Sequence, residues 1–217
     1  MLLPDDLEGV TPKVYFDEVW QRCELFAALH GYMANHATAA LQPDELLRAE
    51  WASRVSALDL YVHELVAQNL LRIFEGQRPS CPGFARLQIS SDALMRIQGA
   101  TTAADRSTAF DLEIRTKLSR STFQYPDDIA DGVRLISPCK LWNEVALKMG
   151  ATPATVSPDT ESLTKRLSLI VDRRNKIVHE GDLQPTVPRT PWPISRADVS
   201  DVAEFINEIV CAIDRIV

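Results

Sequence analysis

The stretch SPDTESLTKRLSLIVDRRNKIVHEG, residues 157–181, carries the most informative pattern in the chain. Ser157 followed by Pro158 is a typical helix start, and Gly181 is typical of the position just past a helix end. With residues 158–180 placed on a helix at about 100° per residue, the apolar side chains fall on one arc: Leu163, Leu167, Ile170, Val171, Ile177 and Val178. The stretch therefore predicts one long amphipathic helix.

The same helical periodicity continues toward the N-terminus. Apolar residues from Phe16 to Met33 recur at the spacing of an amphipathic helix. A second helix is expected to have Pro43 in its first turn and to end near Gly76–Pro79. Ser137-Pro138 repeats the start signal, and a helix from there is expected to stop at Gly150.

The C-terminal part combines a helix-breaking connector with a last helix. Prolines interrupt the connector at positions 185, 188, 191 and 193, and Ser195 is expected to cap the helix that follows. That helix has an apolar seam made of Val199, Val202, Ile206, Ile209, Ile213 and Ile216. The seam packs either on the rest of the bundle or on a second chain.

The middle of the chain, residues 79–136, is less regular. It shows shorter helical patterns, such as Ser91–Ile97 and Ala104–Leu118, between polar stretches. The strand signal is negligible. We therefore predict an all-α fold in one domain, residues 1–217, with residues 79–136 inserted between the two halves of a helical bundle.

Composition limits the function classes. With 217 residues, of which 46% are hydrophobic, the chain is large enough for one globular core. Its net charge of -7 argues against a generic nucleic-acid binder, because contacts to phosphate need Lys and Arg. Binding to RNA would require a local basic patch. The segment Lys165–His179 supplies one, with five Lys or Arg residues and one acid, Asp172.

Other classes are disfavoured by what the sequence lacks. The N-terminal MLLPDDLEGV has neither the basic start nor the apolar run of a signal peptide, and no stretch is long and apolar enough for a membrane span. Cys23, Cys81, Cys139 and Cys211 are scattered without metal-ligand spacing. We expect a cytoplasmic protein that uses no membrane, no metal and no cofactor.

Arg174 is the anomaly of the long helix, because it lies in the middle of the apolar arc. Burying an unpaired guanidinium is costly, so Arg174 needs an anionic or hydrogen-bonding partner or must face a wet cleft. Asp59, an acid in the second helix, is the expected partner. Asn175 and His179 are four residues apart and share one face.

These residue types suit the cleavage of RNA. Attack of the ribose 2′-hydroxyl on the adjacent phosphate requires proton transfer and stabilisation of an anionic phosphorane. A histidine transfers protons near neutral pH, and an arginine offers a fixed charge matched to phosphate oxygens. We expect His179, Arg174 and Asn175 to be catalytic, and Lys165, Arg173 and Lys176 to bind the substrate.

Arg174-Asn175-Lys176-Ile177-Val178-His179 resembles the R-N-x-x-x-H motif of HEPN-superfamily ribonucleases. The sequence WASRVSALDLYVHEL, residues 51–65, is similar to sequences of the HEPN subgroup found with RiboL-PSP proteins. The resemblance implies an up-and-down four-helix bundle with the motif on a late helix. It also implies metal-independent endoribonuclease activity, often in toxin–antitoxin or anti-phage systems, and a homodimer with motif residues of both chains in one cleft. A partner protein such as an antitoxin would then be expected.

Helix geometry independently favours a second surface. Arg174 and His179 are about 140° apart around the helix, which is awkward for contacts to one phosphate. Other interpretations stay open at this stage. His179 would be favourable as a cation near a helix C-terminus, Arg174 would be structural if paired with Asp59, and the lysines and arginines would form a solvated face. The alternative function is a non-catalytic helical module that binds RNA, a nucleotide or a partner protein.

Overall fold

The computed structural model describes residues 10–36 and 41–217. The first nine residues, on which the expectation about a signal peptide mainly rests, lie outside the described residues. The described chain forms these helices: α1 (Pro12–His36), α2 (Asp44–Phe74), the 3-10 helix η3 (Phe84–Arg86), α3 (Ser91–Gly99), α4 (Ala103–Leu118), α5 (Pro126–Arg134), α6 (Leu141–Lys148), α7 (Val156–Glu180) and α8 (Arg196–Asp214). The prediction of an all-α fold is confirmed.

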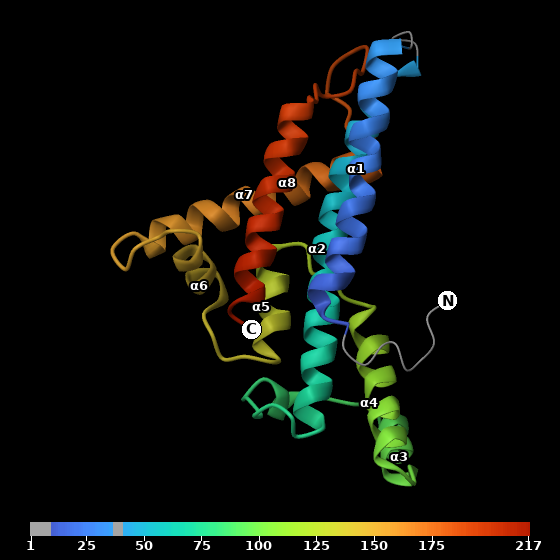
Figure 1. The fold of residues 1–217 in the computed structure, drawn as a ribbon, viewed down its shortest axis with the longest axis vertical. Coiled ribbons are helices and arrows are strands. Elements are labelled where there is room, and N and C mark those ends of the chain that lie inside the picture. The colour runs from blue at the N-terminus through green and yellow to red at the C-terminus, as the bar shows by residue number, and fades with distance from the viewer. Residues whose placement is uncertain (1–9, 37–40) are drawn as a thin grey trace.

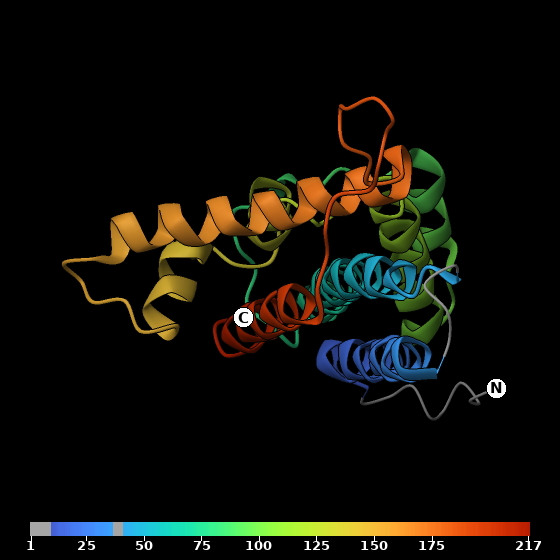
Figure 2. The same cartoon turned by 90° about the horizontal axis from the view of Figure 1, so that it is seen from above.

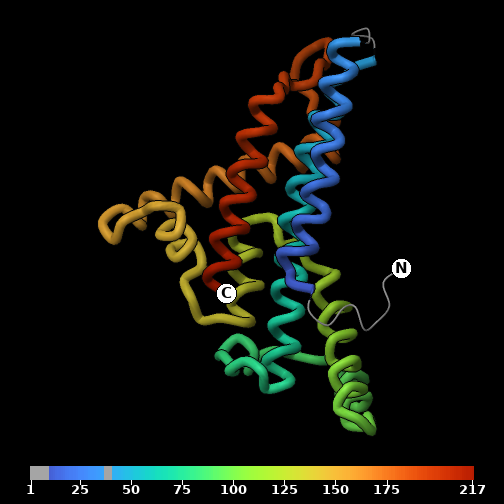
Figure 3. Tube along the Cα trace, in the orientation of Figure 1, coloured from blue at the N-terminus to red at the C-terminus, as the bar shows by residue number. Residues whose placement is uncertain are grey.

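Three long helices run side by side, and the fourth crosses them. Helices α1, α2 and α8 are roughly aligned, whereas α7 lies across them as a separate layer (Figures 1 and 2). The path of the chain in Figure 3 shows α6 folding back beside the start of α7 and the connector leading from the end of α7 to α8. The crossing places the C-terminal turns of α7 over α2.

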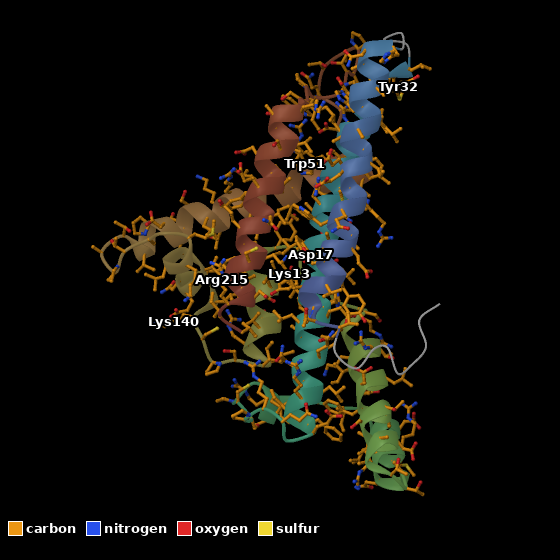
Figure 4. The ribbon with its side chains drawn as sticks, in the orientation of Figure 1. Lys13, Asp17, Tyr32, Trp51, Lys140 and Arg215 are labelled. Atoms are coloured by element: carbon orange, nitrogen blue, oxygen red, sulfur yellow. The ribbon has the colours of Figure 1, made fainter. Side chains whose placement is uncertain are left out.

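Helix α2 is the centre of the packing, because it contacts α1, α4, α5, α7 and α8. Val55, Leu58 and Val62 of α2 are fully buried. Trp51 lies in the interior of the bundle (Figure 4), and its indole Nε1 donates a hydrogen bond to the backbone oxygen of Ile170 at 3.1 Å. A buried indole that both packs and donates in this way fixes α7 against α2.

The middle segment forms two parts with different surroundings. Helices α3 and α4 pack on each other and extend from one end of α2 (Figure 1), where Phe110 of α4 stacks on Phe74 with ring centroids 4.2 Å apart. Helix α5 packs between α2, α6 and α7 and buries Ile129 and Val133 in the common core. We interpret residues 79–136 as an insertion whose second part completes the bundle.

Most of the predicted helix ends are found within a few residues. Gly150 and Gly181 follow their helices with positive φ values of 108° and 68°. Ser195 forms a capping box with Asp198 at the start of α8. The start predicted at Ser137-Pro138 is wrong: Ser137 accepts a bond from the Cys139 backbone N–H in a turn, and α6 begins at Leu141. This local side-chain bond competes with helix formation.

Two apolar patterns had different outcomes. The seam of α8 is buried inside the chain, with Ile206, Ile209 and Ile213 inaccessible to solvent. The intramolecular alternative is therefore confirmed. The residues of the α7 arc from Leu163 to Val171 are buried and Ile177 packs against the core, whereas Val178 is 50% exposed.

The connector is fixed to the bundle by a buried carboxylate. Asp182 is fully buried and accepts hydrogen bonds from Arg48 Nε at 3.1 Å and from Arg173 Nη2 at 3.2 Å. The same two arginines donate to the backbone oxygens of Trp192 at 2.6 Å and Pro193 at 2.7 Å. Helices α2 and α7 and both ends of the connector thus share one hydrogen-bonded network.

No helix in the described part of the chain combines the length and the apolar run that a membrane crossing requires.

We predict that Asp182→Asn lowers the free energy of unfolding by about 3 kcal/mol, because it removes the buried negative charge that pairs with Arg48 and Arg173. Asparagine keeps the size of the side chain and tolerates the φ of 54° at this position. The measurement is urea unfolding followed by circular dichroism. Asp201→Asn, which removes an exposed ion pair to Arg166, is the control and costs less than about 1 kcal/mol. Equal effects of the two variants would contradict the network's role.

Candidate active site at the end of α7

The last turns of α7 are held in place by hydrogen bonds before and after them. Upstream, the Trp51 indole binds the Ile170 carbonyl. Downstream, the backbone N–H groups of Gly181 and Asp182 both donate to the Lys176 carbonyl, which closes the helix. The residues between these two points therefore have a defined orientation, and they include all three predicted catalytic side chains.

A chain of hydrogen bonds runs through two of these side chains. Arg174 Nη1 donates to Asn175 Oδ1 at 3.1 Å. Asn175 Nδ2 donates to the hydroxyl of Tyr125 at 3.0 Å, and that hydroxyl donates to Asp172 Oδ1 at 2.8 Å. Both polar atoms of the Asn175 amide are thus engaged, so its orientation is specified by its neighbours.

Tyr125 is a residue that sequence analysis missed. It is the N-cap residue of α5, directly before Pro126, and it reaches α7 from a segment fifty residues away in sequence. Burial, and next the hydrogen bond to the Asp172 carboxylate, raise the pKa of the Tyr125 phenol above its ordinary value. The hydroxyl is therefore protonated at neutral pH and keeps donating to Asp172. The Tyr-Pro pair marks a helix start, but no local pattern indicates its contact with α7.

The hydrogen-bond donors of the Arg174 guanidinium are only partly paired within the described residues. Its side chain is partly buried, and its Nε atom is buried without a hydrogen-bond partner. The predicted pairing with Asp59 does not form. Asp59 accepts instead from the backbone N–H of Phe123 at 2.6 Å and from Gln124 Nε2 at 3.2 Å. The carboxylate of Asp59 thus fixes the segment that leads into α5.

The three predicted substrate-binding residues differ in their surroundings. Arg173 is engaged with Asp182 and Pro193, and its guanidinium lies 5.0 Å from the ring of Trp51. Through these contacts Arg173 has a structural role, since it links α7 to the connector. Lys165 and Lys176 are exposed, and neither forms an ion pair within the described residues. Their ammonium groups are accessible to a ligand.

His179 is exposed in the last turn of α7 and is outside the hydrogen-bonded chain formed by the described residues. The buried residues of α7 are Leu163, Leu167, Ile170 and Val171, and Arg174 belongs to the same side of the helix. His179 lies about 140° away, on the outer face that also carries Asp172 and Lys176. The structure therefore brings Arg174 and Asn175 together and leaves His179 on the adjoining surface.

The chain was compared with models of protein families. The model for RiboL-PSP-HEPN matches residues 21–217, which is most of the chain and includes the whole of α7. The chain belongs to the RiboL-PSP-HEPN family. The expected membership of the HEPN superfamily, in the subgroup found with RiboL-PSP proteins, is therefore confirmed, and the helical bundle is HEPN-like. No curated protein and no solved structure matches the chain.

HEPN membership suggests a nuclease or another RNA-related role. In this HEPN chain, the end of α7 offers a planar cation in Arg174, an oriented amide in Asn175 and an accessible imidazole in His179. An arginine binds phosphate oxygens through its fork of N–H donors, and an imidazole transfers protons. Within the described residues, no group of three or more His, Cys, Asp or Glu side chains is arranged to hold a metal ion.

We predict that the Tyr125 hydroxyl and the Asp172 carboxylate are energetically coupled in this HEPN domain. Tyr125→Phe and Asp172→Ala each remove one partner of the 2.8 Å hydrogen bond, and a double-mutant cycle from urea unfolding is expected to give about 1 kcal/mol of coupling. A cycle between Tyr125→Phe and Asp201→Ala is the control, since Asp201 pairs with Arg166. Coupling no larger than in the control would show that the bond does not form in solution.

Proposed function

We propose that this HEPN domain is a metal-independent endoribonuclease whose catalytic residues are Arg174, Asn175 and His179. The observation that carries the proposal is the Asn175 amide held between Arg174 Nη1 and the Tyr125 hydroxyl, next to an exposed His179. Such an arrangement orders the polar groups before substrate binds, which is where enzymes gain most of their electrostatic stabilisation. Membership of the family supports an RNA substrate.

The reaction needs only the side chains present. The imidazole of His179 takes the proton of the ribose 2′-hydroxyl, and the 2′-oxygen forms a bond to the adjacent phosphorus. The bond from phosphorus to the 5′-oxygen then breaks, and that oxygen takes the proton back from the imidazolium of His179, which returns to its neutral form. The products are a 2′,3′-cyclic phosphate and a 5′-hydroxyl. Arg174 stabilises the charge on the phosphorane.

The complete site is proposed to use two chains. Arg174 and His179 lie on different sides of α7, so one helix does not present both groups to a single phosphate. A second copy of the chain, packed against the end of α7, supplies the missing group. Lys176 and Lys165 on the outer face then contact neighbouring phosphates of the RNA.

The biological role proposed for this activity is a toxin or an anti-phage defence effector, with an antitoxin or another partner protein that controls it. Uncontrolled RNA cleavage is harmful to the cell that contains it. Expression of the wild-type chain is therefore expected to stop growth, and His179→Ala is expected to relieve the inhibition. Normal growth with the wild-type chain at the same protein level would argue against a toxin.

We predict cleavage of single-stranded RNA in the presence of EDTA, with a loss of about 100-fold or more in His179→Ala. The rate is measured on labelled RNA by gel electrophoresis. His36→Ala is the matched control, because His36 is also exposed in the last turn of a helix. RNA binding by the wild-type chain with no turnover in any buffer would favour the non-catalytic HEPN module instead.

Mixing two inactive variants tests the composite site. Arg174→Gln and His179→Ala are each expected to be inactive alone, whereas their mixture regains a measurable part of the wild-type rate, because some dimers then combine an intact Arg174 with an intact His179 of the partner. Light scattering gives the mass of each sample. If dimers exchange subunits and the mixture stays inactive, both groups must come from the same chain.

A further inference from the structure

A second feature of the outer face of α7 is a cavity of about 330 Å³ between α7 and the connector. Leu169, Trp192 and Pro193 form its apolar wall, and Asp172 and Lys176 form part of its polar wall. Its size is at the lower end of the range for small-ligand pockets. The cavity is separate from the Asn175 amide but shares Asp172 with the hydrogen-bonded chain.

Trp192 is more exposed than the other three tryptophans of the chain. It is 42% exposed, whereas Trp51 and Trp142 are 6% and 9% exposed. Leu169, which faces the same cavity, is 60% exposed. Both apolar side chains line the cavity, and a ligand that covered them there would gain the hydrophobic stabilisation that they lack in water.

The backbone that carries Trp192 is nevertheless rigidly placed. Its N–H donates to the Asp182 carbonyl at 2.7 Å, and its carbonyl accepts from Arg48 Nη2 at 2.6 Å. Prolines on both sides restrict the backbone further. The backbone from which the exposed Trp192 side chain projects is therefore fixed, so a ligand that stacks on the ring has no connector backbone to order.

The location of the cavity indicates which ligand it takes. Lys176 lies on its rim and is three residues before His179, so the two side chains share one face of α7. A phosphodiester held at His179 would place an adjacent nucleotide over Lys176 and its base beside Trp192. Aromatic rings bind the bases of single-stranded RNA by stacking, and a lysine at the edge binds the backbone.

We infer that the cavity between α7 and the connector is a nucleobase subsite, in which one base of the RNA stacks on Trp192 next to Leu169. The inference rests on the proposed ribonuclease function and deepens it, because it adds a contact to a base beside the contacts to phosphate. Trp192 binds substrate and takes no part in proton transfer. The Asp182 network, by fixing both ends of the connector, positions the subsite relative to the catalytic residues.

The test is the affinity for a short, labelled, single-stranded RNA of adenosines, measured by fluorescence anisotropy in a His179→Ala background that prevents cleavage. Trp192→Ala is expected to weaken binding by roughly 5- to 150-fold, which is the range found for single stacking contacts. Trp192→Phe keeps an aromatic face and is expected to stay within a few-fold of the parent. Tyr32→Ala is the control: Tyr32 is 65% exposed on α1 (labelled in Figure 4) and does not line the cavity.

The outcomes separate this inference from the function on which it rests. If the parent binds the RNA and Trp192→Ala binds it equally well, the subsite is wrong while an RNA-binding function stands. If Trp192→Phe loses as much affinity as Trp192→Ala, with both variants showing the circular dichroism of the parent, stacking is wrong. If neither the parent nor the wild-type chain binds this RNA, the proposed function and the subsite are both overturned.

Discussion

The carboxylate of Asp182, buried between two arginines, is the interaction on which the geometry of the functional end depends. Arg48 reaches it from α2 and Arg173 from α7, and both arginines also bind carbonyls of the connector. A buried charge is tolerated only where partners of this kind surround it. The network joins the end of α7 and both ends of the connector to α2, in addition to the bond between the Trp51 indole and the Ile170 carbonyl.

The catalytic assignment follows from how α7 distributes its polar residues. Arg174 lies on the side of the helix that faces the core, and its guanidinium is tied through Asn175 to Tyr125 and Asp172. His179 lies on the outer face, where it is open to solvent. The guanidinium of Arg174 is therefore oriented by its neighbours, whereas the imidazole of His179 is accessible to solvent. This division is the physical reason for proposing that a second chain completes the site.

The fold was largely predictable because its signals are local. Helical periodicity located the long helices, and glycine and serine residues marked several of their ends, such as Gly181 and Ser195. The start predicted at Ser137 was wrong because the same serine signal also forms a turn. Helix α5 was not predicted individually, since its few apolar residues are spread over only nine positions.

The site was predictable only where its residues are close in sequence. The R-N-x-x-x-H pattern lies on one helix, so Arg174, Asn175 and His179 could be proposed as catalytic residues from the sequence alone. Tyr125 and Asp182 were missed, because their partners are supplied by distant segments: Tyr125 meets Asn175 from fifty positions away, and Asp182 meets Arg48 across 134. The Asp59 pairing failed for the same reason, since the loop at residues 123–124 takes both carboxylate oxygens.

The proposed reaction uses the 2′-hydroxyl of the RNA as its nucleophile. Mass spectrometry of the ends produced by the purified chain tests this most directly. We expect fragments with a 2′,3′-cyclic phosphate on one side and a 5′-hydroxyl on the other, and no cut at a position that carries a 2′-deoxyribose. Fragments with a 3′-hydroxyl and a 5′-phosphate, or cleavage at the 2′-deoxy position, would contradict it.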